Sequence, residues 1–143
     1  VAWYRNPPRS AGDSLCVAYR NEFGNWRGMY PDFVFFERVD GRVVPSIIDP
    51  HRHDLDAAAI ARGAGCSRTR LYEAFAAQGQ TVMGVLRDMR LQRAQGLLTQ
   101  GQRLNVGALA WRCGFGDPSD FSKLFRARFG LSPTEWHQRL WGR

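Results

Sequence analysis

The sequence predicts a mainly α-helical protein in which a long linker helix joins two helix-turn-helix units and a short N-terminal extension precedes them. Apolar side chains recur at helical spacing from residue 54 onwards. The pattern of helix, glycine turn and capped helix then occurs twice, at an offset of 49 to 50 residues. Charge follows the same division: residues 1–53 hold seven basic and six acidic side chains, net +1, whereas residues 54–143 hold thirteen and seven, net +6.

Residues 1–53 form the extension, which we interpret as an addition to the helical part or as the remnant of an upstream regulatory domain. The apolar run at 33–39 and the turn-forming pair Asp40-Gly41 favour a β-hairpin. A short helix within 33–48 is the competing interpretation, because short apolar runs fit both structures, although Pro45 limits its length. This segment is too small to hold a sheet domain alone.

The first helix-turn-helix unit is expected at about residues 55–79. A helix over 55–62 and a second capped helix fit the spacing of the apolar side chains. The assignment rests on Asp54 and Ser67 as N-caps, on Gly63-Ala64-Gly65 and Gly79 as helix ends, and on Leu71 and Phe75 as the buried side of the second helix.

A linker helix is expected at about 81–100, a second unit at about 105–130 and a final helix at about 133–140. Gly114 takes the turn of the second unit, and Asp117 caps its second helix. Phe121 and Phe125 mark the buried side of that helix, as Leu71 and Phe75 do in the first unit.

Burying one side of each second helix exposes the other side, which can enter a major groove. The residues on the exposed sides are the candidates for reading bases: Thr69, Tyr72, Glu73, Ser119, Ser122, Lys123 and Arg126. Arginines around these helices are the candidates for phosphate contacts: Arg68, Arg70, Arg87, Arg90, Arg112 and Arg128.

The overall charge points to the same class of partner. A formal net charge of +7 and a pI near 10.2 favour polyanions, chiefly nucleic acid, with anionic membranes second. All of the 20 basic residues except Lys123 are arginines, which form forked hydrogen bonds to phosphate and guanine. We therefore expect double-stranded DNA as the partner.

Membrane insertion, export and cofactors are not predicted. No apolar run approaches the roughly 18 residues that span a bilayer, and no signal peptide opens the chain. The cysteines Cys16, Cys66 and Cys113 are far apart and lack a C-x-x-C spacing, which is typical of reduced thiols rather than a metal site. The His51-Arg52-His53 run is read as a bend in a linker. We expect a cytoplasmic, nucleoid-associated protein with no cofactor and no metal.

Two other functions remain as alternatives. A helical protein–protein adaptor without DNA affinity would lack salt-dependent binding to duplex DNA. A fragment of a DNA-repair or alkyl-transfer enzyme would use Cys16, His51 or His53 and an aspartate in the first part of the chain, but this cysteine lacks the surrounding motif. We expect no catalytic residues and no enzymatic activity.

Residues 55–140 resemble the DNA-binding domain of the AraC/XylS family of transcription regulators. The first unit matches through Ala61-x3-Gly65-x-Ser67-x3-Leu71-x3-Phe75. The signature region matches through Ala110-x3-Gly114-Phe115-x-Asp117-x3-Phe121-Ser122-Lys123-x-Phe125 and Phe129-Gly130-x-Ser132-Pro133. The resemblance implies two reading helices in successive major grooves and regulation of transcription, usually activation through contact with RNA polymerase.

Three departures limit what the resemblance implies. Val44–His53 matches poorly the helix that leads into the first unit in the family, and Pro45 and Pro50 interrupt it. His137 stands where an arginine is common. The effector-binding β domain of the family is absent or reduced to residues 1–50, so no small-molecule effector is inferred.

Overall fold

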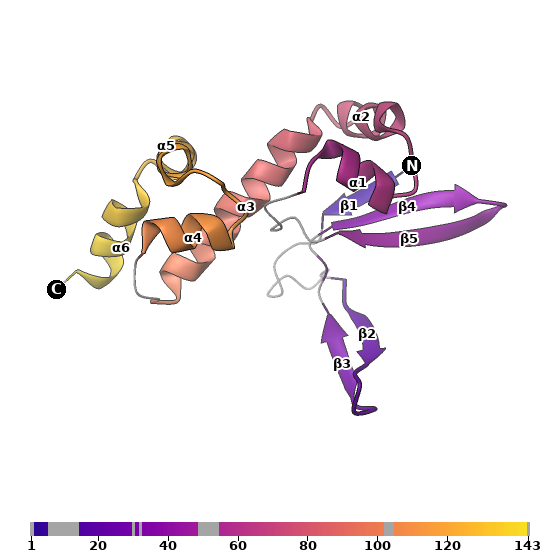
Figure 1. Ribbon diagram of the computed structural model, residues 1–143, viewed down its shortest axis with the longest axis horizontal. Coiled ribbons are helices and arrows are strands. Elements are labelled where there is room, and N and C mark those ends of the chain that lie inside the picture. Colours follow the sequence, from indigo (N-terminus) through magenta and orange to yellow (C-terminus); the bar gives the residue numbers. More distant parts are fainter. Residues whose placement is uncertain are drawn as a thin grey trace. The chain divides into compact units, whose positions relative to one another are not determined.

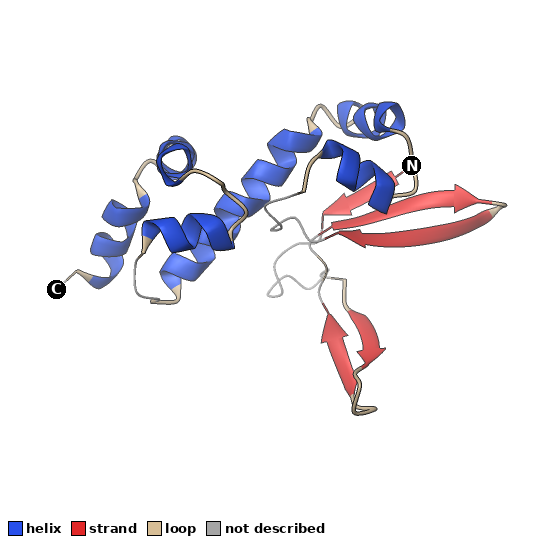
Figure 2. Ribbon diagram, in the orientation of Figure 1, coloured by secondary structure: helices blue, strands red, loops and turns tan. Residues whose placement is uncertain are grey.

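The computed structural model describes residues 2–5, 15–29, 31, 33–48, 55–101 and 105–142. Within these ranges five short strands precede six helices, so the predicted mainly α-helical class is confirmed (Figures 1 and 2). The chain divides into two compact units. The first contains the strands and the first two helices, and the second contains the remaining helices, including the linker helix from Met83 onwards.

The strands of the first unit form two antiparallel sheets. Strands β1 (Ala2–Arg5), β4 (Phe33–Val39) and β5 (Arg42–Ile48) form a sheet in the order β1-β4-β5. Strands β2 (Val17–Arg20) and β3 (Trp26–Met29) pair with each other.

The β4–β5 hairpin decides between the two predictions for residues 33–48. Asp40 and Gly41 form its two-residue turn with φ values of 48° and 77°, and Val39 pairs with Arg42 beside that turn. Positive φ at both turn residues is what a tight hairpin requires. The strand interpretation is confirmed and the helical one is wrong. Pro45 sits in β5 opposite Phe36, on the outer strand of the described sheet, where a missing N–H is tolerated.

Two helices complete the first unit: α1 (Ala57–Gly63) and α2 (Arg68–Ala76). The N-cap of α1 is Asp56, whose carboxylate accepts a 2.7 Å hydrogen bond from the amide of Ala59. The prediction of Asp54 as this N-cap was wrong by two residues, and Asp54 itself lies outside the described residues. Ser67 caps α2 as expected, accepting from Arg70 N at 3.2 Å.

The core of the first unit joins the sheet to both helices. Its buried side chains come from β4, α1 and α2, and the indole of Trp3 in β1 stacks on Phe75 with 4.2 Å between ring centroids. The fully or nearly fully buried members include Val34, Phe35, Ile60, Ala61, Leu71 and Phe75. The strands therefore form one wall of the core beneath α2.

Helices are the only secondary-structure elements in the described residues of the second unit. It contains α3 (Val82–Thr99, from Met83 onwards), α4 (Val106–Arg112), α5 (Pro118–Phe129) and α6 (Pro133–Trp141). Asp117 caps α5 as predicted, and Gly130 ends it with a φ of 81°. The buried core consists of Leu91, Ala94, Leu98, Leu109, Ala110, Cys113, Phe121 and Phe125.

Candidate nucleic-acid interface

The two helix pairs repeat one turn geometry, although they lie in different units. Ala61 and Ala110 are buried where the paired helices approach each other. In the first pair Cys66 N donates to Ala61 O at 3.0 Å, and in the second Phe115 N donates to Ala110 O at 2.9 Å. The intervening Gly65 and Gly114 have φ values of 67° and 85°, a backbone region that disfavours side chains with a Cβ. The internal repeat of the sequence is therefore also a repeat of structure.

Helix α2 presents a polar outer side. Leu71 and Phe75 are buried on its inner side. Thr69, Tyr72 and Glu73 are exposed, and half of the Tyr72 side chain is accessible. Because these positions alternate with the buried ones at helical spacing, the outer side is a surface that a DNA groove can accept. The flanking arginines Arg68 and Arg70 are also exposed.

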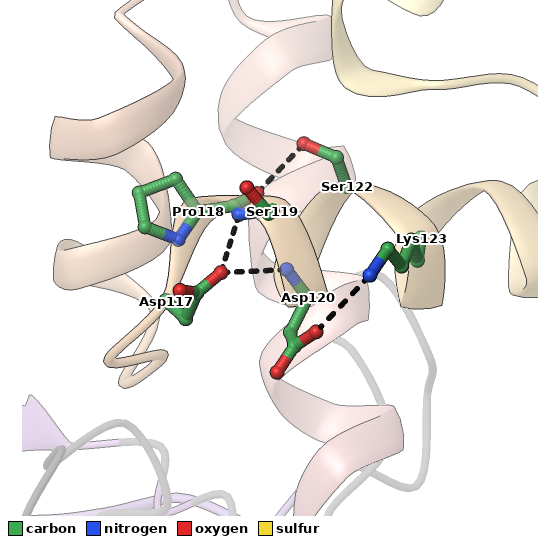
Figure 3. A network of polar contacts seen from close by, with 6 residues as sticks. All are labelled: Asp117, Pro118, Ser119, Asp120, Ser122 and Lys123. Carbon is green, nitrogen blue, oxygen red and sulfur yellow. Dashed lines mark hydrogen bonds and ion pairs between the residues drawn. The ribbon is translucent and has the colours of Figure 1, made fainter.

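The start of α5 is organised by a single carboxylate (Figure 3). Asp117 Oδ1 accepts from the amides of Ser119 at 2.7 Å and Asp120 at 2.8 Å. Pro118 occupies the first helical position, where its missing N–H costs nothing. This cap fixes where α5 begins and therefore which of its residues face outwards.

Ser119 and Lys123 occupy the exposed side of α5. Lys123 is 78% exposed, and its ammonium lies 3.6 Å from the carboxylate of Asp120 on the same helix (Figure 3). An ion pair this exposed is weak, so it leaves the lysine available to a phosphate or a guanine. On the opposite side Phe121 and Phe125 are completely buried.

Ser122 differs from the other predicted base-reading residues. It is half-buried, and its hydroxyl donates to the carbonyl of Pro118 at 2.8 Å (Figure 3). In this rotamer its proton is used within the helix, and only the oxygen lone pairs remain to accept a bond.

The two arginines at the end of α5 contact neighbouring helices. Arg126 Nη2 lies 3.1 Å from Glu135 Oε1 in α6, and Arg128 Nε lies 2.7 Å from Asp88 Oδ1 in α3. Sequence reasoning identified both arginines but neither carboxylate partner. An acidic residue gives no sequence signal for a partner that lies 40 residues away, as Asp88 does from Arg128.

Glu135 also closes the N-terminus of α6 in a capping box. Its Oε2 accepts from Ser132 N at 2.7 Å, while Glu135 N donates to Ser132 Oγ at 3.3 Å. The backbone hydrogen bond from Ser132 is the main cause that lowers the pKa of Glu135, the Ser132 side chain adds to it, and Arg126 contributes a smaller attraction. The carboxylate that holds Arg126 is therefore kept ionised.

Arg90 corrects one of the predicted phosphate contacts. Its side chain is only 8% exposed, and its Nη2 donates to the carbonyl of Leu55 at 3.5 Å. A guanidinium buried in the second unit cannot reach a phosphate on the protein surface, so Arg90 has a structural role. Arg87 and Arg112 are exposed, and their phosphate contacts stay predictions.

A cavity of about 340 Å³ in the second unit is lined by Arg87, Arg90, Asp117 and Asp120, together with apolar side chains of α3 and α5. The charged side chains in this lining are two arginines and two aspartates. Among the residues with described placement, His, Cys, Asp and Glu side chains do not gather in groups of three that could hold a metal. The His51–His53 run lies outside those residues.

The chain matches two protein families over ranges that overlap. Residues 60–139 match the helix-turn-helix domain family, and residues 1–89 match the YagJ family. A probable AraC family transcriptional regulator from Rhodopseudomonas palustris shares 30% identity over 64% of this chain and 86% of its own, with a TM-score of 0.57. The chain belongs to the AraC/XylS family. Its N-terminal part also belongs to the YagJ family.

Two further proteins place this AraC/XylS chain among DNA-binding regulators. The transcriptional activator RhaR from Klebsiella pneumoniae is 41% identical over 76 residues, 52% of this chain and 27% of RhaR. The DNA-binding domain of AdpA, solved in complex with a target DNA, is 28% identical over 62% of this chain and 81% of its own, with a TM-score of 0.57. The chain thus spans about a quarter of the length of RhaR. None of its described helices has the length and apolarity that crossing a bilayer demands.

Proposed function

We propose that this chain is the DNA-reading part of a transcription regulator, with α2 and α5 entering successive major grooves of one duplex. The observation that carries the proposal is the repeated helix pair, in which each second helix buries two large side chains and exposes a polar side. The helices of the region 54–143 supply this reading head, with the first pair at about 55–79, the linker helix at about 81–100, the second pair at about 105–130 and the final helix at about 133–140.

Different parts of the surface have different roles in this proposal. The exposed outer sides of the two helices read bases through Thr69, Tyr72, Glu73, Ser119 and Lys123, with Ser122 and Arg126 at their margin. Phosphates are bound by exposed arginines beside these helices, namely Arg68, Arg70, Arg87 and Arg112. Because arginine and lysine donors match guanine and phosphate acceptors, the interface combines specificity with electrostatic attraction.

The wider role follows from relatives of this family. RhaR is named a transcriptional activator, so we propose that the complete protein acts on transcription with RNA polymerase as its partner and works in the cytoplasm. No catalytic step is assigned to any residue. The N-terminal strands, which provide a wall of the first unit, are proposed as an extension of the reading head.

The test is selection of bound sequences from a random duplex pool, followed by titration of the selected duplex at several salt concentrations. We expect two short sequence elements whose centres lie about 10 base pairs apart, because the two reading helices occupy successive major grooves. Affinity should fall steeply with salt, since each phosphate contact releases counterions. A chain that enriches no sequence, and binds duplex DNA no better than a neutral protein does, would instead be an adaptor.

A further inference from the structure

The C-terminal turn of α5 is tied to both helices that flank it in the second unit. Arg128 reaches Asp88 of α3 at 2.7 Å, and Arg126 reaches Glu135 of α6 at 3.1 Å. The inner side of α5, in contrast, makes apolar contacts through Phe121 and Phe125. Apolar contacts are not directional, so they allow a helix to roll or slide slightly. Ion pairs with defined donor geometry restrict those motions.

Both oxygens of the Asp88 carboxylate accept hydrogen bonds. Oδ1 accepts from Arg128 Nε at 2.7 Å, and Oδ2 accepts from Gln92 Nε2 at 3.1 Å, one turn along α3. The side chain of Asp88 is 26% exposed and that of Arg128 is 49% exposed. Water therefore competes less for this pair than for an open surface pair, and the short charge-assisted bond is of the stronger kind.

We propose that Asp88 is a positioning residue for DNA reading: acting through Arg128, it fixes the orientation of α5 and hence the direction in which Ser119 and Lys123 point. This inference rests on the proposed function. Ser119 lies nine residues before Arg128, about 13 Å along the helix axis. A tilt of about 5° at the tied end would displace Ser119 by about 1 Å, beyond the tolerance of roughly 0.5 Å for a binding constellation.

This assignment changes the role of Arg128. The sequence predicts a phosphate contact, in which the guanidinium would face DNA and contribute one released counterion. The structure instead directs Nε at a carboxylate, so the pair is close to neutral as a unit. The two roles differ in what happens when the charges are exchanged between positions 88 and 128.

The experiment measures binding of four chains to a duplex selected by the wild type and to an unrelated duplex of equal length. The chains are wild type, Asp88→Asn, Arg128→Gln and the exchange variant Asp88→Arg with Arg128→Asp. We expect each single variant to bind the selected duplex about tenfold more weakly, with unchanged affinity for the unrelated duplex and an unchanged salt slope. The exchange variant should recover affinity to within about threefold of wild type, because the pair is rebuilt in reverse.

The opposite pattern would assign Arg128 to the phosphates. In that case Arg128→Gln lowers the salt slope by about one, and the exchange variant binds worse than either single variant because it points a carboxylate at DNA. Wild-type affinity in Asp88→Asn would also overturn the proposal. Arg139→Gln, which removes one exposed charge from α6, is the matched control for net charge.

Hydrogen exchange of the DNA-free chains separates this inference from the proposed function. Asp88→Asn should accelerate exchange of the α5 amides at 126–130 by about tenfold while those of α4 stay unchanged. Unchanged exchange at 126–130 would refute the positioning role even where DNA binding is affected. If the wild type enriches no duplex, the proposed function fails. Faster exchange in Asp88→Asn would then show that Asp88 only stabilises α5, and its role in reading DNA would be overturned as well.

Discussion

The indole ring of Trp3 lies flat on the phenyl ring of Phe75, with 4.2 Å between their centroids and 5° between their planes. Its Nε1 donates to the carbonyl of Ala74 at 3.4 Å, and the ring of Phe35 lies 6.2 Å from that of Phe75. Two strands thus supply aromatic side chains to the inner side of α2. Helix α2 therefore rests on a sheet, whereas α5 rests on an all-helical core.

Truncating Trp3 to alanine should therefore weaken the helix it supports. Trp3→Ala is expected to lower the free energy of unfolding of the first unit by roughly 3 kcal/mol, because a large aromatic contact is lost. Urea unfolding measures the loss, and hydrogen exchange should locate it in α2. Trp26→Ala, at a tryptophan that is 66% exposed in β3, should cost less than about 1 kcal/mol. Equal costs for the two variants would contradict the support role of Trp3.

Removal of the Phe125 ring should lower the stability of the second unit. This ring lies 5.7 Å from Phe121, 4.7 Å from Phe129 and 6.0 Å from Trp136, and it is completely buried. Phe125→Ala should cost roughly 3–5 kcal/mol of unfolding free energy because the cavity cannot refill. Thermal or urea unfolding measures it, and Leu140→Ala, at a half-exposed site of α6, should cost far less. A loss below about 1 kcal/mol would show that the cluster is loosely filled.

Lys123 should affect DNA binding without affecting stability. Its side chain is 78% exposed and its pair with Asp120 is weak, so Lys123→Gln should leave the unfolding free energy within about 0.5 kcal/mol of wild type. Affinity for the selected duplex should fall about tenfold, since one base or phosphate contact is lost. Fluorescence titration at fixed salt measures this. Lys123→Arg should recover much of the affinity, and unchanged binding of Lys123→Gln would remove the residue from the interface.

The buried thiol of Cys113 should make stability depend on pH in the alkaline range. Burial raises the pKa of this thiol from 9.0 to about 11, against a smaller lowering by Arg93 and Arg112. Between these values the unfolded chain loses the proton and the folded chain keeps it, so folding stability should fall as the pH rises from about 9 to about 11. Unfolding by urea at a series of pH values measures the slope.

A cysteine variant isolates that contribution. Above pH 9, the free energy of unfolding should fall less steeply with pH in Cys113→Ala than in the wild type. Cys16→Ala should leave this pH dependence unchanged, because Cys16 is exposed. Alkylation gives a second readout, because the protonated buried thiol should react far more slowly than that of Cys16. Equal reaction rates in the folded protein would show that the Cys113 thiol is accessible.

Much of the helical fold could be predicted because its determinants are local. The spacing of Leu71 and Phe75, or of Phe121 and Phe125, identifies a buried side within a single helix, and Ser67 and Asp117 mark helix starts. The first N-cap was misplaced because two aspartates, Asp54 and Asp56, stand close together and either satisfies the pattern. Strands β1, β2 and β3 gave no usable signal, since strands of four residues are too short for periodicity.

The candidate site was less predictable, because its polar contacts join distant segments. The spacing rule places Thr69 and Lys123 on outer sides and says nothing about whether a given arginine faces water. Arg87 and Arg90 are the same residue type in the same helix, yet only Arg87 is exposed. The partners of Arg126 and Arg128 depend on how α3 and α6 pack against α5, which local patterns do not encode.

Pro45 has a consequence for how copies of this protein meet. It stands on β5, the outer strand of the described three-stranded sheet, opposite Phe36. One edge of β5 pairs with β4. At Pro45 the opposite edge has no N–H group to donate a hydrogen bond. A strand from a second molecule that tried to extend the sheet there would leave one of its carbonyls unmatched. This interruption guards a strand with exposed apolar side chains at Val43, Val44 and Ile47 against the ribbon-like self-assembly that open sheets invite.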